Sequence, residues 1–157
     1  MYNKSEKGFT LVEIMIVVAI IALLATIAIP GIIRSRVTAN ESNAIATLKS
    51  IATGAETFRA AQATSSYPAN LAAITTGATP PYVSGFSGGA VKAGYTFVLS
   101  GDSDEFDCTA VPTSISTGQR AFCVDQRGDV WSTATGTITY TSPGANVDCA
   151  AGSIISQ

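Results

Sequence analysis

A run of twenty residues without a charged side chain, Ile14 to Ile33, constrains this chain more than any other feature. As a helix rising about 1.5 Å per residue, such a run is about 30 Å long, which matches the hydrocarbon core of a membrane. A carboxylate, Glu13, stands directly before it. An ionisable group at this place costs about 2.5 kcal/mol or more unless it is paired, so Glu13 is a candidate functional residue. Cleavage after Gly8 would create a partner for it, the α-amino group of Phe9.

The residues around this cleavage point closely resemble the processing site of type IV prepilins. Gly8 matches the residue before the cut, Phe9 matches the new N-terminus, and Glu13 matches the acid at the fifth mature position. Pro30 falls at the twenty-second mature position, where the family also carries proline. The resemblance is strong over about residues 4–60 and is architectural beyond them.

The resemblance implies that a prepilin peptidase cuts after Gly8 and methylates Phe9. It further implies that the subunit waits in the inner membrane as a single-pass protein with its head outside. Inner-membrane assembly machinery would then build it into an extracellular helical filament of identical copies. In that filament Glu13 would neutralise the terminal amine of a neighbouring subunit, while the apolar segments form the core. The filament would be most stable in the correct axial register, because buried opposite charges recover their desolvation cost only when they meet.

Two simpler explanations of the N-terminal segment fit less well. A secretory signal has an apolar core of about 7–15 residues and a small-x-small cleavage site, whereas this run is longer and contains no Ala-x-Ala. A plain membrane anchor leaves Glu13 unexplained. Basic residues do not decide the orientation, since Lys4 and Lys7 precede the span and two arginines follow it. The orientation therefore comes from the resemblance.

Composition argues against an enzyme and against a nucleic-acid binder. The formal charge is −2, and the basic residues after Arg36 are scattered, so they form no electrostatic footprint for nucleic acid. The chain has no histidine, which removes the commonest general base and the commonest transition-metal ligand. We therefore expect no catalytic residues, no cofactor and no metal.

The expected fold class is α+β, with a long N-terminal hydrophobic helix whose C-terminal half packs on a four-stranded antiparallel sheet. The expected divisions are a cleaved leader at 1–8, a transmembrane or filament-core helix at 9–36, and an exported head at 37–157. Within the head we expect an amphipathic helix at 37–61, a loop at 62–94 and the sheet with a C-terminal segment at 95–157. The helix should run from about Thr10 to about Ala61.

Pro30 and Gly31 predict a disturbance in the first half of this helix. Proline cannot donate a hydrogen bond to the carbonyl four residues earlier, which belongs to Thr26, and its ring crowds that group. We therefore expect a kink or a local loss of helix near Thr26 to Gly31.

The second half of the helix carries one apolar stripe at three- and four-residue spacing. Its members are Ile45, Leu48, Ile51, Ala52, Ala55 and Phe58. The charged residues Glu41, Lys49, Glu56 and Arg59 fall largely off that stripe. The stripe is therefore the expected contact with the sheet.

Proline and glycine punctuate Thr64 to Ala93 as a loop, with room for a short helix near Leu71–Thr75. Alternating and β-rich segments then predict a meander of four strands with a short fifth. The expected strands are Tyr95–Leu99, Phe106–Val111, Arg120–Val124, Val130–Trp131 and, as the short one, Ile138–Tyr140.

Three cysteines, Cys108, Cys123 and Cys149, lie in the part expected to be exported, where disulfides form. A hairpin turn centred between Ile115 and Ser116 would place Cys108 opposite Cys123, and a bridge there would contribute about 3 kcal/mol in the chain-entropy model. The resemblance to type IV pilins implies instead a tether from Cys149 to Cys123 or Cys108. All three pairings stay open at this point, and each leaves one thiol over.

Four acidic residues cluster at the first strand turn: Asp102, Asp104, Glu105 and Asp107. A calcium site is conceivable there, and the resemblance extends to pseudopilins that bind calcium in their heads. The EF-hand spacing fails, however, because the sixth position of the loop is Asp107 and not glycine. We therefore expect a solvated hairpin tip.

The most economical interpretation is a type IV pilin, the structural subunit of a cell-surface fibre used for adhesion, motility or a related role. A pseudopilin of a type II secretion system and a minor pilin are the alternatives. The N-terminal segment fits all three, so only the head can separate them.

Overall fold

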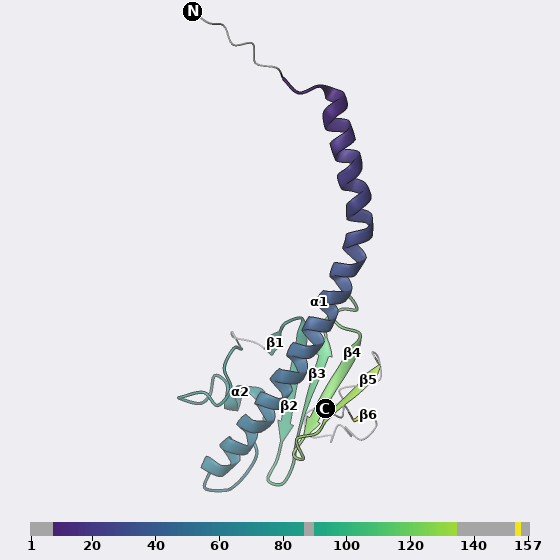
Figure 1. Cartoon of the computed structure of the whole chain (residues 1–157). Helices are drawn as coiled ribbons and strands as arrows, with labels where there is room; N and C mark the ends of the chain where they lie inside the picture. Colours follow the sequence, from purple (N-terminus) through teal and green to yellow (C-terminus); the bar gives the residue numbers. More distant parts are fainter. Residues whose placement is uncertain (1–7, 87–89, 135–152, 155–157) are drawn as a thin grey trace, which may run out of the picture. The chain divides into compact units, whose positions relative to one another are not determined.

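The structure is a computed structural model that describes residues 8–86, 90–134 and 153–154. The chain divides into two compact units, Met1–Ser35 and Arg36–Gln157, and each is described by itself. One helix, α1 (Leu11–Ala61), supplies the described helix of the first unit and continues into the second (Figure 1). The expected α+β class, with a long helix packed on an antiparallel sheet, is confirmed.

The part of α1 in the first unit is apolar all round and stays exposed among the described residues. Its large side chains are exposed, from Leu11 at 74% through Leu23 at 66% to Ile33 at 48%. Among the described residues α1 is the one helix long and apolar enough to cross a membrane. Such a surface is suited to lipid or to other copies of the same segment rather than to water.

The helix runs through Pro30 without interruption, so the local loss of helix considered for Thr26 to Gly31 is not found. Two hydroxyl groups bond to carbonyls on either side of the proline. Thr26 Oγ1 donates to the carbonyl of Ala22 at 2.9 Å, and Ser35 Oγ donates to the carbonyl of Gly31 at 3.0 Å. A kink at Pro30 and Gly31 stays a prediction.

The sheet of the second unit is a simple antiparallel meander in the order β1-β2-β3-β4-β5-β6 (Figure 1). Its strands are β1 (Val91–Lys92), β2 (Tyr95–Gly101), β3 (Phe106–Pro112), β4 (Arg120–Asp125), β5 (Val130–Ala134) and β6 (Ser153–Ile154). The four expected main strands are the four long ones, but the sheet has six strands and not four or five. The two additions are two-residue strands at its edges, too short to leave an alternating pattern in the sequence. The expected strand Ile138–Tyr140 lies outside the described residues.

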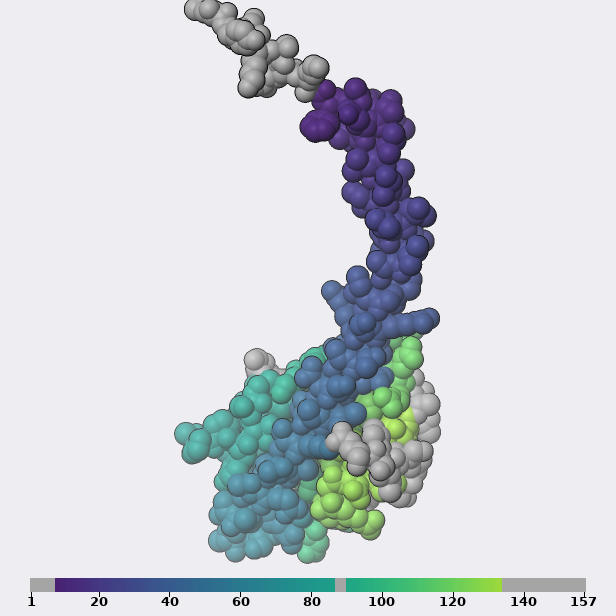
Figure 2. Space-filling view, viewed as in Figure 1, coloured from purple at the N-terminus to yellow at the C-terminus, as the bar shows by residue number. Residues whose placement is uncertain are grey.

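The core of the head lies between one stripe of α1 and one face of the sheet. From α1 it contains Ala44, Leu48, Ile51, Ala52 and Ala55, and from the sheet mainly Tyr95, Phe97, Leu99, Phe106, Cys108, Ala110, Phe122, Val124 and Val130. The stripe expected from the sequence therefore packs as expected, with Ile45 and Phe58 partly buried at its margins. Figure 2 shows this part of α1, in blue, lying across the head between the teal connection and the green strands.

The connection from α1 to the sheet packs closely on the helix. It contains α2 (Leu71–Ile74), the short helix expected near Leu71–Thr75. The backbone N–H groups of Tyr82 and Val83 both donate to the carbonyl of Ile74 at 3.0 Å. A side chain at Gly54 of α1 would collide with Val83, so glycine is what allows this close approach.

Candidate assembly site

The residues of the expected processing junction lie in an exposed segment that precedes the helix. Gly8 and Phe9 are not helical, and the Phe9 side chain is 85% exposed. Apart from Gly8 and its two chain neighbours, no described residue has an atom within 4 Å of the position that a Cβ would take at Gly8. Among the described residues, therefore, none covers the peptide bond between Gly8 and Phe9.

The helix begins one residue later than expected because Thr10 caps it. Thr10 Oγ1 accepts the backbone N–H of Glu13 at 3.2 Å, and the backbone N–H of Thr10 donates to Glu13 Oε2 at 2.8 Å. This reciprocal pair is a capping box, in which a threonine and the glutamate three residues later satisfy each other's backbone donors. The hydroxyl of Thr10 also lies 2.8 Å from Glu13 Oε2. The candidate assembly residue is therefore tied to the first turn of its own helix.

The two oxygens of the Glu13 carboxylate differ in their surroundings. Oε2 receives both contacts from Thr10, whereas no described residue donates a hydrogen bond to Oε1. An ionised carboxylate can accept about four hydrogen bonds, so Glu13 retains acceptor capacity on the side of Oε1. Chemically, this end of the helix can receive a cation.

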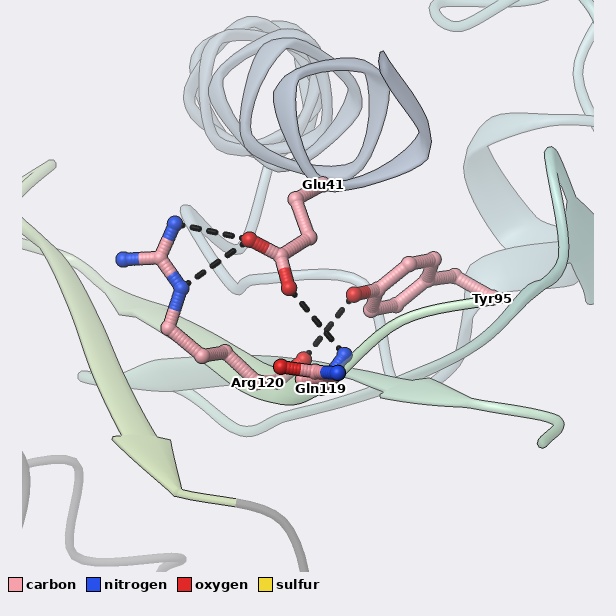
Figure 3. A network of polar contacts seen from close by, with 4 residues as sticks. All are labelled: Glu41, Tyr95, Gln119 and Arg120. Atoms are coloured by element: carbon pink, nitrogen blue, oxygen red, sulfur yellow. Dashed lines mark hydrogen bonds and ion pairs between the residues drawn. The ribbon is translucent and has the colours of Figure 1, made fainter. Parts of the chain in front are cut away.

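A second carboxylate of α1, Glu41, anchors the helix to the sheet inside the head (Figure 3). Its Oε2 accepts from Arg120 Nη2 at 2.7 Å and from Arg120 Nε at 3.0 Å. Its Oε1 accepts the backbone N–H of Gln119 at 3.1 Å. Glu41 is 7% exposed, and the Arg120 side chain is half exposed. Both oxygens of this buried carboxylate are therefore satisfied, one by the last residue of the β3–β4 turn and the other by the first residue of β4.

Tyr95 completes the same network from β2. Its hydroxyl donates to the carbonyl of Arg120 at 3.0 Å, and a side chain at Gly118 would collide with that hydroxyl. Burial, followed by the negative charge of Glu41, raises the pKa of Tyr95 to about 12. The phenol stays protonated at neutral pH and keeps its donor role. Asn40 adds a hydrogen bond from Nδ2 to the carbonyl of Thr117 at 3.0 Å.

The sequence interpretation placed Glu41 off the packed stripe, and this was wrong. The residue lies three positions before Ala44 and seven before Leu48, which is the spacing of the stripe itself. Glu41 was left out of the predicted stripe because it is charged, although its position is in phase with the stripe. The signal that could have found it is a charged residue in phase with an apolar stripe, which requires a partner when it is buried.

The acidic turn between β2 and β3 contains residues in two different situations. Asp102 Oδ1 accepts the backbone N–H groups of Asp104 and Glu105 at 2.9 and 3.0 Å, and these bonds lower the pKa of Asp102. Among the described residues no group of acidic or thiol side chains could hold a metal ion. This part of the cluster is an exposed turn whose backbone is organised by one aspartate.

Asp107 departs from the expected solvated tip. It lies in β3 opposite Asp125 of β4 and is 8% exposed. Desolvation, followed by the nearby charge of Glu105, raises the pKa of Asp107 from 3.8 to about 6. The head therefore keeps a carboxyl group in surroundings that disfavour its charged form.

The pairing of Cys108 with Cys123, one of those left open by the sequence, is contradicted because Cys108 is a free thiol. The register places Cys108 opposite Val124, and Cys123 opposite Thr109, so the two thiols project from opposite faces of the sheet. The register differs by one residue from the expectation because the turn is centred on Ser116, where Ser114 accepts backbone bonds from both Thr117 and Gly118.

The two described cysteines have different states. Cys108 is a free thiol in the core, and burial followed by the charge of Asp107 raises its pKa. Cys123 takes part in a disulfide. Cys149, its partner in the alternative pairing, lies outside the described residues.

Comparisons with known proteins agree with the geometry of the N-terminal segment. The prokaryotic N-terminal methylation motif matches residues 3–29. The type IV major pilin protein PilA of Myxococcus xanthus is 46% identical over 57 residues, which cover 36% of this chain and 26% of that protein. The chain carries this motif and is distantly homologous to type IV major pilins.

Two further relatives match over different lengths. The type IV wide pilus major component PilA4 of Thermus thermophilus is 38% identical over 71 residues, covering 45% of this chain and 53% of that protein. A fimbrial protein of Pseudomonas aeruginosa is 74% identical over 27 residues, covering 17% of this chain and 18% of that protein. The matches thus span about half or less of the length of these relatives. No solved structure matches the chain.

The ion pair of Glu41 with Arg120 yields a prediction for stability. Arg120→Met should lower the free energy of unfolding by about 2 kcal/mol, because it leaves a buried carboxylate without its cation. The double variant Glu41→Leu with Arg120→Met should lose clearly less than the sum of the two single losses. Urea unfolding of the full chain in detergent, followed by the fluorescence of Trp131, measures these changes. Arg127→Met, at an exposed turn, is the control and should stay within about 0.5 kcal/mol. Strict additivity of the two single variants would contradict the coupling.

Asp107 yields a prediction for the pH dependence of stability. Its folded pKa of about 6 lies above its ordinary value of 3.8, so the folded state binds a proton more tightly. The wild type should therefore lose stability relative to Asp107→Asn as the pH rises from 3.8 to about 6, and the difference should be constant above that. The measurement is unfolding of both proteins across that range.

Asp102→Asn is the control with the opposite sign. The pKa of Asp102 is lowered from 3.8, so the wild type should lose stability relative to this variant as the pH falls through 3.8. Equal pH profiles for Asp107→Asn and the wild type would show that Asp107 is not desolvated in solution.

Proposed function

We propose that this protein is a type IV pilin, a structural subunit that polymerises through α1 into a cell-surface filament. The observation that carries the proposal is the pairing of a long uncovered apolar helix with a single carboxylate at its start, directly after the Gly8–Phe9 junction. The relatives named major pilins support the same role. The protein is then a substrate of a peptidase and not an enzyme.

The steps of assembly follow from the residues. A prepilin peptidase cuts between Gly8 and Phe9 and methylates the new amine. The subunit is held in the inner membrane by its apolar segment, with the head outside, until the assembly machinery extracts it. Glu13 then pairs with the Phe9 amine of a neighbouring copy. An uncompensated carboxylate at the membrane end of a helix is costly, and so is an uncompensated amine, so their meeting favours one axial register over slipped ones.

A type II secretion pseudopilin is the second candidate, because the N-terminal segment would serve a short periplasmic fibre equally well. A minor pilin that initiates or caps fibres is the third. The named relatives favour the major pilin over both. Intact mass and N-terminal analysis of filaments sheared from cells separates them: a dominant subunit that begins at methylated Phe9 supports the major pilin. A processed chain that stays with the envelope, with none in sheared fibres, would contradict it.

Glu13 provides the test of the assembly step. Glu13→Ala removes the carboxylate and should leave cleavage after Gly8 intact, while filament yield falls by about tenfold or more, as expected for the loss of a charge-assisted contact. The measurement compares the processed subunit in membranes with the subunit in sheared filaments. Glu56→Ala, a carboxylate in the second half of α1, is the control and should assemble normally. A normal filament yield from Glu13→Ala would contradict the proposal that the Glu13 carboxylate fixes the axial register of neighbouring subunits.

We also propose that the exported head is closed by a disulfide between Cys123 and Cys149. Cys108 is free and buried on the other face of the sheet, and Cys123 takes part in a disulfide, which leaves the alternative pairing. Peptide mapping without reduction should find the Cys123 and Cys149 peptides linked, and the Cys108 peptide alkylated only after unfolding. A linked Cys108 peptide would contradict the proposal.

A further inference from the structure

We propose that one end of the head contacts the membrane surface before assembly and binds anionic phospholipid headgroups there. This end, which we call the near end, consists of β1, the β1–β2 turn at 93–94, the β3–β4 turn at 113–119 and residues 36–41 of α1. The proposal rests on the membrane stage of the proposed function, in which the apolar segment holds the subunit in a bilayer.

Hydrogen bonds join the parts of the near end into one surface. The carbonyl of Gly94 accepts from the backbone N–H of Thr113 at 2.9 Å and from its hydroxyl at 3.0 Å, which ties the two turns together. Asn40 of α1 donates to the carbonyl of Thr117 at 3.0 Å. Glu41 binds the residues that follow the same turn (Figure 3). The start of α1 in the head and both turns therefore move as a unit.

Both large hydrophobic side chains that the described part of the head exposes lie at the near end. Ile115, in the β3–β4 turn, is 80% exposed, and Val91, in β1, is 57% exposed. The residues on either side of Ile115 are serines, and their hydroxyl groups bond to each other at 2.7 Å. An apolar side chain that projects among hydroxyl groups suits the boundary between lipid headgroups and acyl chains.

The near end is also basic. Arg36 is exposed, Lys92 is half-buried, and the Arg120 side chain is half exposed. Among the described residues the one carboxylate at this end is Glu41, which is buried and paired with Arg120. Arg36 and Lys92 remain for lipid phosphates, which such cations bind through charge-assisted hydrogen bonds.

The opposite end of the sheet carries the acidic residues. The β2–β3 and β4–β5 turns lie there, because alternate turns of an antiparallel meander share an end. The described carboxylates within and beside these two turns are Asp102, Asp104, Glu105, Asp107, Asp125 and Asp129, against one cation, Arg127. A negatively charged membrane surface attracts the near end and repels this one, so its field turns the near end toward the lipid.

The length of the chain between the apolar run and the near end fits this contact. Arg36 follows Ile33, the last residue of the run, by three positions, and Asn40 follows Arg36 by four. Four residues of helix rise by about 6 Å, and the headgroup region on each side of a bilayer is about 5–7 Å thick. A bilayer that takes up the apolar run therefore has Arg36 among its headgroups and the β3–β4 turn, held by Asn40, near their outer limit.

A second copy of the chain is the other occupant that the charges allow, with its acidic end against the near end. Among the described residues, however, the acidic end exposes no large hydrophobic side chain that would cover Ile115. A lipid surface offers both phosphate groups and acyl chains, so the observations favour lipid.

The experiment places a tryptophan at the β3–β4 turn and measures its contact with lipid. Full chains that carry Trp131→Phe, which removes the one native tryptophan, together with Ile115→Trp are reconstituted at one chain per vesicle. The vesicles contain phosphatidylcholine, phosphatidylglycerol and a phosphatidylcholine brominated near the headgroup end of its acyl chains. We expect the bromine to quench Ile115→Trp by about twofold or more, because the side chain lies at the acyl boundary. Ser103→Trp, in the exposed β2–β3 turn, is the matched control and should stay unquenched.

The charges are tested with the same readout. Without phosphatidylglycerol the quenching of Ile115→Trp should fall, because each cation near an anionic surface shifts the docking equilibrium about fivefold. Adding Arg36→Gln and Lys92→Gln should abolish this dependence, whereas Arg127→Gln, at the acidic end, should leave it unchanged. Quenching that is equal with and without phosphatidylglycerol would overturn the binding of anionic headgroups.

Leu23→Trp, within the apolar run, separates this proposal from the proposed function. If Leu23→Trp is quenched and Ile115→Trp is not, the proposal is overturned and the membrane stage stands. If neither is quenched, the apolar segment is not in the bilayer, and the membrane stage fails together with this proposal. A spectral shift of Ile115→Trp that appears only at many chains per vesicle, without quenching, would assign the near end to a second copy and overturn the lipid contact.

Discussion

The central physical constraint on this protein is an apolar helix surface that the described residues leave exposed. Ile14 to Ile33 form helix, and the structure describes no other element among residues 8–35 that could cover them. Each large aliphatic side chain gains about 1.5–3 kcal/mol on burial, while a whole domain is stable by only about 5–15 kcal/mol. Lipid, or other copies of the same segment, would provide the apolar cover that the described residues do not. Residence in a membrane and polymerisation would each remove this apolar surface from water.

In the head, by contrast, the amphipathic half of α1 is buried on a small sheet and must be held there in a single register. The apolar stripe of α1 supplies the area, but apolar contacts carry no direction of their own. Glu41 supplies that direction, because its carboxylate fits only where Gln119 and Arg120 meet it. A buried ion pair adds little net stability, but displacing it is costly, so it specifies position.

The features predicted correctly from the sequence are those that short-range pattern determines. The stripe of α1, the short helix at Leu71 and the four long strands each leave a periodicity or a turn signal inside a few residues. The register predicted for β3 and β4 differs by one residue from the observed register. The register depends on how the turn at Ser114 to Gly118 closes, which the sequence pattern does not reveal. A shift of one residue exchanges the faces of a strand, which is why it reversed the cysteine prediction. The partner of Glu41 lies 79 residues away and has no local signature.

Glu13 and Glu41 stand on the same helix, and the difference between them shows how its two halves are used. Both oxygens of Glu41 are filled by groups of its own chain, so this carboxylate is complete in the monomer. Only Oε2 of Glu13 accepts hydrogen bonds from a described residue, so Oε1 keeps acceptor capacity among the described residues. A carboxylate that a chain orders but only half satisfies, at the start of a helix that it cannot cover, is the arrangement that an assembling subunit needs. Glu41 is buried and paired, which fixes how α1 lies on the sheet. Glu13 is exposed at the start of the helix and would need a partner if assembly buried it.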